Sequence, residues 1–103
     1  MTAVVLVVYG TPKDPAHFDD YYARVHVPLA AKIPNLAGLT LSKAPIAALA
    51  GGAAHLVARL EFADMGVLQA SMGSAEGKAT AADLGNFASG GVQILAFEED
   101  RKA

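Results

Sequence analysis

The sequence predicts an α+β fold in which a four-stranded antiparallel sheet carries its helices on one face. Four stretches rich in apolar and β-branched residues alternate with two helical stretches, in the order strand, helix, strand, strand, helix, strand. A Gly- and Ala-rich stretch joins the two middle strands as a hairpin. This order is that of the split βαβ, or ferredoxin-like, plan, written βαββαβ.

The first strand is predicted over residues 3–9, Ala-Val-Val-Leu-Val-Val-Tyr, and ends at Gly10-Thr11-Pro12. Apolar and polar residues do not alternate in this run, so we expect a central strand that is buried on both faces. Helices cover one face, and we expect a second subunit to cover the other and form a dimeric α+β barrel. Hydrophobic residues make up 53% of the 103 residues, which is high for so small a chain and supports this expectation.

A helix is predicted over residues 14–33. Asp14 can accept hydrogen bonds from the first turn, and Pro15 suits the first helical position because it has no N–H to leave unpaired. At about 100° per residue, five side chains share one face that should pack on the sheet: Phe18, Tyr21, Tyr22, Val25 and Leu29.

His26 falls at the border of this apolar stripe, one turn after Tyr22, so we expect it to be half-buried. Pro28 cannot donate a hydrogen bond to the carbonyl of Arg24, and its ring crowds that turn. The helix should therefore kink or loosen near His26.

The second and third strands are predicted over residues 37–46 and 55–62, joined by a loop at 47–54. The third strand alternates clearly. Its helix-facing set should be Leu56, Ala58, Leu60 and Phe62, and its opposite set His55, Val57, Arg59 and Glu61. Arg59 and Glu61 would be partly enclosed there, and an ion pair would satisfy both.

The second helical region is predicted in two pieces. Asp64 should cap a short helix over residues 65–72, and Ser74 should cap a second that runs to about residue 87. A fourth strand is predicted over residues 92–98.

Composition favours a single domain, residues 1–103, with neither nucleic acid nor a membrane as a partner. The net charge of −2 provides no basic patch for phosphates. Residues 3–9 are too few to span a bilayer, and no positively charged segment precedes them. The absence of cysteine excludes disulfides and thiolate metal sites and is compatible with a reducing compartment. We expect a cytoplasmic protein.

The run from Pro12 to Leu29, Pro-Lys-Asp-Pro-x-x-Phe-x-x-Tyr-Tyr-x-x-x-His-x-Pro-Leu, resembles the EthD-like proteins of the dimeric α+β barrel superfamily, named for a protein in ethyl tert-butyl ether degradation. The run Ser74–Gly77, followed by Asp83-Leu84 and Phe87, resembles the second helical region of that family. The resemblance covers the whole chain and implies a homodimeric barrel with no obligatory cofactor. Related superfamily members include polyketide cyclases, a muconolactone methyl-isomerase and quinol-type monooxygenases.

His26 is the first candidate catalytic residue, because an imidazole near pH 7 could exchange a proton with a bound carbonyl or phenol. The alternative is a structural histidine that hydrogen-bonds the carbonyl freed by Pro28. Tyr22 is the second candidate: it could orient the imidazole or a ligand, or be a core tyrosine with its hydroxyl at the edge.

Four further residues are candidates for ligand binding: Tyr21, Asp19, His55 and Arg59. Asp19, two turns before His26, could reach the same site or be a solvated carboxylate of the early helix. His55 and Arg59 could bind a carboxylate or enolate in the barrel interior, or belong to a salt bridge of the dimer interface. Three scattered histidines and the lack of a glycine-rich phosphate loop predict neither a metal nor a nucleotide cofactor.

Two functions fit these residues. The first is a cofactor-independent enzyme of catabolism or secondary metabolism that binds a small hydrophobic, oxygenated molecule and uses His26 for isomerisation, cyclisation or elimination. The second is a non-catalytic dimeric protein that binds a ligand or assists a degradation pathway, in which His26 is structural.

Overall fold

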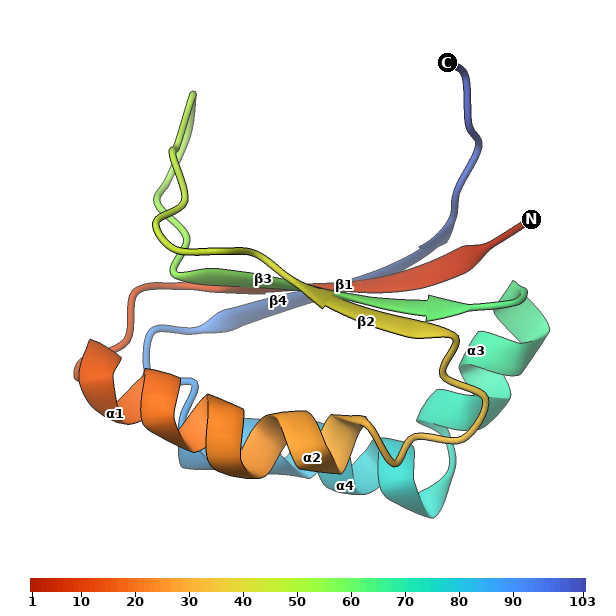
Figure 1. The fold of residues 1–103 in the computed structure, drawn as a ribbon, viewed down its shortest axis with the longest axis horizontal. Coiled ribbons are helices and arrows are strands. Elements are labelled where there is room, and N and C mark those ends of the chain that lie inside the picture. The colour runs from red at the N-terminus through yellow and green to blue at the C-terminus, as the bar shows by residue number, and fades with distance from the viewer.

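The computed structural model of the protein describes residues 1–103 and has two layers, a sheet and a set of helices (Figure 1). The strands are β1 (Ala3–Tyr9), β2 (Gly38–Leu41), β3 (Leu56–Phe62) and β4 (Val92–Glu98). The helices are α1 (Pro15–Tyr21), α2 (Val27–Ala30), α3 (Met65–Met72) and α4 (Ala75–Asp83), with a π-helical turn at Tyr22–His26 and a 3₁₀ turn at Leu84–Asn86. None of these helices combines the length and apolar content that crossing a membrane requires.

The sheet has the strand order β2-β3-β1-β4, and each neighbouring pair is antiparallel. β1 is therefore central, as its unalternating apolar sequence predicts. All helices lie on one face of the sheet (Figure 1). Strand order and chain order together confirm the ferredoxin-like βαββαβ fold.

The core between sheet and helices is centred on an aromatic cluster. Tyr9, the last residue of β1, lies with its ring centroid 5.3 Å from that of Phe18, 5.6 Å from that of Tyr22 and 5.6 Å from that of Phe87. These rings come from β1, α1, the π-helical turn and the segment after α4. The cluster therefore holds both helical regions against the same end of the sheet.

The helix predicted over residues 14–33 begins as expected, because the Asp14 side chain accepts a hydrogen bond from the backbone N–H of His17 and Pro15 is the first helical residue. It then loosens into the π-helical turn, where the backbone N–H of Val27 bonds to the carbonyl of Tyr22, five residues back. The next residue is Pro28, which has no N–H. The prediction that the helix loosens near His26 is confirmed.

The π-helical turn changes which side chains face the sheet. A turn with five-residue hydrogen bonds holds one residue more than an α-helical turn. Beyond it, His26 and Ala30 occupy the positions relative to Phe18 that Val25 and Leu29 would take in a continuous α-helix. His26 is 5% exposed and Ala30 4% exposed, whereas Val25 and Leu29 are only half-buried. The predicted half-buried position of His26 is therefore wrong: it is a core residue.

Two predicted boundaries are also wrong. α2 ends at Ala30 rather than at residue 33, and β2 spans Gly38–Leu41 rather than residues 37–46. The last backbone hydrogen bond between the β2 segment and β3 runs from the N–H of Ser42 to the carbonyl of Val57. Pro45 follows and has no N–H to donate. Residues 43–54, which we call the arm, project from the sheet on the face away from the helices (Figure 1).

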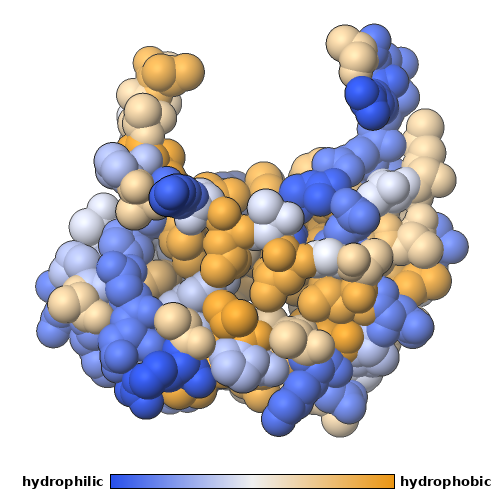
Figure 2. Space-filling view, viewed as in Figure 1, coloured by the Kyte–Doolittle hydropathy of each residue, from blue (hydrophilic) through white to orange (hydrophobic).

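The sheet face away from the helices is apolar at β4. Leu95 and Phe97 are 43% and 39% exposed, and they pair in register with Leu6 and Val4 of β1. Figure 2 shows hydrophobic side chains gathered at the level of the sheet, below the arm and the C-terminal segment. The dimeric barrel predicted from the sequence requires an apolar surface of this kind on this face of the sheet.

An ion cluster lies beside this apolar surface. Arg59 Nη1 is 2.8 Å from Glu61 Oε1, and the same guanidinium pairs with Glu99. Hydrogen bonds from Arg59, first to Glu99 and then to Glu61, raise the pKa of its guanidinium. The predicted ion pair of Arg59 with Glu61 is confirmed, with Glu99 as an additional partner.

Candidate functional site

His26 forms a buried pair with a carboxylate from the second helical region. Its Nδ1 lies 2.9 Å from Oδ2 of Asp83, the last residue of α4. The two side chains are 6% and 8% exposed. An ionised carboxylate can only accept, so Nδ1 carries the proton, and in the neutral imidazole Nε2 is left with a free lone pair. Nε2 is thus the atom through which this ring can take up or release a proton.

Asp83 is fixed by two more donors. The Tyr21 hydroxyl donates to Oδ1 over 2.6 Å, and the Asn86 side-chain amide donates to the same oxygen over 2.9 Å. Burial acts to raise the pKa of Asp83, but the hydrogen bonds from Tyr21, Asn86 and His26 outweigh it and hold the pKa below its ordinary value of 3.8. Asp83 is therefore an anion at neutral pH, and it holds the imidazole in one tautomer and orientation.

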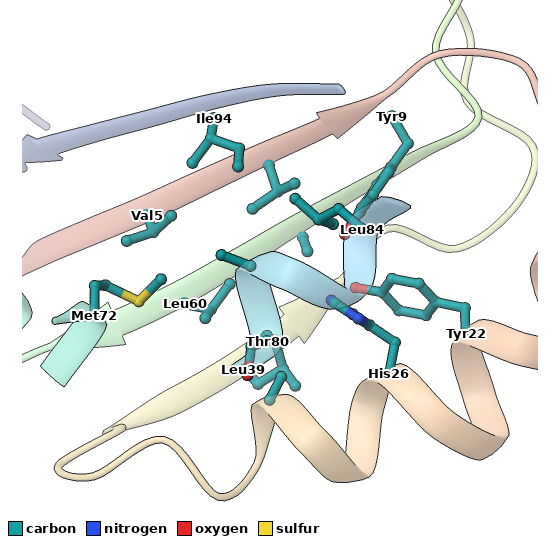
Figure 3. Close-up of a pocket in the computed structure, with 14 residues that line it drawn as sticks. Val5, Tyr9, Tyr22, His26, Leu39, Leu60, Met72, Thr80, Leu84 and Ile94 are labelled. Atoms are coloured by element: carbon teal, nitrogen blue, oxygen red, sulfur yellow. The ribbon is translucent and has the colours of Figure 1, made fainter. Parts of the chain in front are cut away.

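The His26 ring forms part of the wall of a cavity between the helices and the sheet (Figure 3). The cavity itself has a volume of about 40 Å³. When the neighbouring space that is open to solvent is included, the volume is about 440 Å³. Most of its lining is aliphatic and includes Val5, Leu39, Leu60, Met72, Leu84 and Ile94. A dry lining of this kind strengthens any hydrogen bond or charge interaction made inside it.

Two phenols share the cavity with the imidazole. The ring centroid of Tyr22 is 5.1 Å from that of His26, and Figure 3 shows the Tyr22 hydroxyl beside the imidazole. Burial raises the pKa of Tyr22 to about 12 and raises that of Tyr9 as well. Both phenols are therefore protonated at neutral pH and can donate hydrogen bonds. The other polar lining residue, Thr80, donates its hydroxyl to the Glu76 carbonyl.

A second histidine–aspartate pair lies outside the cavity. His55 Nε2 is 2.7 Å from Asp19 Oδ1, and the His55 ring packs edge-on against Phe18 with centroids 4.8 Å apart. The prediction that His55 shares a sheet face with Arg59 is wrong, because residue 55 precedes β3 and its side chain turns toward α1. Asp19 consequently meets His55 instead of His26.

The structure thus divides the predicted site residues into three groups. His26, Tyr22 and Tyr21 meet around Asp83 and the cavity. Asp19 and His55 pair at the surface, and Arg59 lies on the opposite face of the sheet. The individual roles of these residues remain predictions.

Sequence reasoning did not select Asp83 and Asn86 as site residues. They lie 57 and 60 positions from His26 in the chain, and no periodicity links a residue on one helix to a partner on another. The one available signal was the Asp83-Leu84 and Phe87 part of the family resemblance.

A comparison with known protein families covers most of the chain. The model of the EthD domain matches residues 11–91, which include both His26 and Asp83. The chain belongs to the EthD family. Residues 11–91 extend from the turn after β1 to the residue before β4, so the match spans both helical regions that form the cavity.

Relatives in the EthD family and beyond align with nearly the whole chain. An uncharacterized 11.0 kDa protein in the thcB–thcC intergenic region of Rhodococcus erythropolis is 38% identical over 96 residues, 93% of each chain. The crystal structure of an EthD family protein from Bacillus halodurans is 28% identical with a TM-score of 0.87, covering 97% of this chain and 100% of that one. A dimeric ferredoxin-like protein of unknown function from Thermobifida fusca is 13% identical with a TM-score of 0.69, covering 94% and 90%.

Proposed function

We propose that this EthD protein binds a small, largely apolar, oxygenated molecule in the cavity and transfers a proton on it through Nε2 of His26. The observation that carries the proposal is the buried His26–Asp83 pair, with 2.9 Å between Nδ1 and Oδ2, at the wall of an apolar cavity. A fixed carboxylate stabilises the imidazolium that forms when Nε2 accepts a proton. The pair therefore has the arrangement of a general base with its orienting group.

The reaction that suits these groups is a proton transfer beside a carbonyl. Nε2 of His26 takes a proton from a carbon next to the carbonyl, and the electron pair moves into the carbonyl oxygen as an enolate. Burial raises the pKa of Tyr22 to about 12, so at neutral pH its hydroxyl is protonated and can donate a hydrogen bond to that oxygen. If the substrate also has a double bond between its β- and γ-carbons, the enolate extends to the γ-carbon, and returning the proton there completes an isomerisation. Loss of a leaving group from the β-carbon, with formation of an α,β double bond, completes an elimination.

Ligand entry requires the cavity to enlarge. Its 40 Å³ holds only a few water-sized groups. Met72 has a flexible side chain, and Ile94 lies on the edge strand β4 and is 48% exposed. Movement of these two side chains would enlarge the cavity without disturbing the His26–Asp83 pair.

We also propose that the working form is a homodimer in which the apolar face of the sheet is covered by a second copy. The exposed Leu95 and Phe97 support this, as does the dimeric state of the Thermobifida fusca protein. Sedimentation at micromolar concentration checks it, since a monomer of 10.6 kDa would contradict it.

The second candidate function is a non-catalytic ligand-binding or accessory protein. Its supporting observation is that Asp83 accepts from three side chains in one place, which also suits a purely structural polar network. In that case the cavity binds a ligand, and His26 holds the two helical regions together.

The two functions differ in what His26→Asn does. Panels of aromatic and lactone metabolites are screened by thermal shift, since a ligand that binds only the folded state raises the melting temperature. For each ligand that binds, turnover is followed in the wild type and in His26→Asn. Removal of a general base should lower turnover by about 10²- to 10⁴-fold while ligand binding remains. Unchanged turnover in a folded His26→Asn variant rejects the catalytic role and leaves the binding function.

A further inference from the structure

Tyr22 lies between two hollows of the molecule. On one side it lines the inner cavity with His26. On the other it lines an open groove, about 380 Å³ in volume, between the helical segment and the sheet. No other residue lines both hollows.

The two hollows lie next to each other between the helical segment and the sheet. On β2, Leu39 lines the inner cavity and Leu41, the next side chain on the same strand face, lines the groove. On the helical segment, His26 lines the cavity and Val27 lines the groove. The groove and the cavity are therefore neighbouring compartments with the Tyr22 ring as their common wall.

The groove is apolar except for one carboxylate. Phe18, Ala23, Val27, Leu41 and Leu56 line it with Tyr22, and Asp19 is its one charged residue. Asp19 is 66% exposed and is held at the rim by His55 over 2.7 Å. An anionic ligand in the groove would be repelled by this carboxylate, whereas a neutral ring would meet only apolar surface.

We propose that the groove holds the apolar body of the ligand, and that the oxygenated end passes the Tyr22 ring to reach His26. This inference rests on the proposed function and adds to it a ligand class: an elongated, neutral molecule with a flat apolar body and a single oxygenated end. Tyr22 then acts as the specificity-determining residue between the two compartments, and Asp19 excludes carboxylates from the outer one.

The groove is tested with 2-naphthol and 2-naphthoate, which share one ring system and differ in charge at neutral pH. Binding of each is followed by its own fluorescence. We expect 2-naphthol to bind the wild type more tightly than 2-naphthoate. Asp19→Asn should raise the affinity for 2-naphthoate by about 5-fold, the factor expected for removing one charge at contact distance in a watery setting, and leave that for 2-naphthol unchanged. Equal affinities in the wild type, or no saturable binding of 2-naphthol, overturn the proposal.

A filling variant locates the bound ring. Ala23→Trp places an indole in the groove, and Ala79→Trp makes the same change at an exposed helical alanine that lines neither hollow. We expect Ala23→Trp to weaken 2-naphthol binding at least 10-fold and Ala79→Trp to leave it unchanged. Equal affinity in both variants overturns the groove proposal, as does a change of oligomeric state in Ala23→Trp alone, which would show that a second copy occupies the groove.

A third variant separates this inference from the proposed function. Met72→Trp fills the inner cavity and leaves the groove lining intact. If only Met72→Trp abolishes 2-naphthol binding, the groove proposal fails and the cavity remains the binding site. The proposed acid/base role is judged independently, by turnover in His26→Asn.

Discussion

The protein holds two histidine–aspartate pairs that have similar geometry and different surroundings. The inner pair, His26 with Asp83, is 6% and 8% exposed, with 2.9 Å between its atoms. The outer pair, His55 with Asp19, is 20% and 66% exposed, with 2.7 Å between its atoms. Distance alone does not tell them apart.

Burial determines what each pair can do. The inner carboxylate is shielded from water and accepts from three side chains, so removing it leaves the buried donor of His26 without a partner. The outer carboxylate is largely solvated, so if either side chain of the pair is removed, water can hydrogen-bond to the one that remains. The difference indicates that the inner pair is held inside the protein, while the outer pair stays in contact with solvent at the rim of the groove.

The largest expected difference between the pairs is in stability. Asp83→Ala should lower the free energy of unfolding by about 3–5 kcal/mol, because it leaves the buried His26 without its partner and removes the acceptor of Tyr21 and Asn86. Asp19→Ala, the same substitution in the outer pair, should cost no more than about 1 kcal/mol. Urea unfolding of both variants measures this. Equal costs would show that burial does not distinguish the two pairs.

A smaller effect is expected in alkali at the inner site. Burial raises the pKa of Tyr22 from 10.0 to about 12, so between these pH values the unfolded chain loses this proton while the folded protein keeps it. Stability should therefore fall through this range, with Tyr22 contributing on the order of 2 kcal/mol. Tyr22→Phe should remove that part of the loss in urea unfolding at pH 9 to 12, a range chosen to span the two values. An identical pH dependence in the variant would contradict the burial of this phenol.

In acid, the contribution of the inner pair to stability should fall as the pH decreases. The pKa of Asp83 is lower in the folded protein than its ordinary value of 3.8, so its contribution is complete above that value and is lost as the pH falls through the folded pKa. In Asp83→Asn, the free energy of unfolding should depend less on pH in the acid range. Asp19→Asn serves as the control for a solvated carboxylate, and an equally reduced pH dependence in that variant would contradict the assignment to Asp83.

The smallest expected effect is that of salt on the outer pair. The stability difference between wild type and Asp19→Asn should shrink as sodium chloride rises to 1 M, where the screening length is about 3 Å. The difference between wild type and Asp83→Asn should change little, because the inner pair is shielded from ions. Equal salt dependence of both differences would place the two pairs in the same environment.

The sequence was sufficient for the fold because each element has a local signal. The apolar run of β1, the Asp14-Pro15 helix start and the alternation in β3 are patterns within a few residues of one another. The site depends on contacts between distant segments, so Asp83 could not be paired with His26 by spacing. His26 was misplaced for a different reason: the 100° rule presumes an unbroken α-helix, and the π-helical turn adds one residue.

The additional residue in the π-helical turn suggests how this helix can gain or lose length in evolution. If the same chain formed an unbroken α-helix here, Val25 and Leu29 would take the places of His26 and Ala30 on the buried face. Because the π-helical turn absorbs one residue, deletion of a residue before His26 in this turn would restore α-helical hydrogen bonding and leave the imidazole on the buried face. The start of the helix at Asp14-Pro15 would be unaffected.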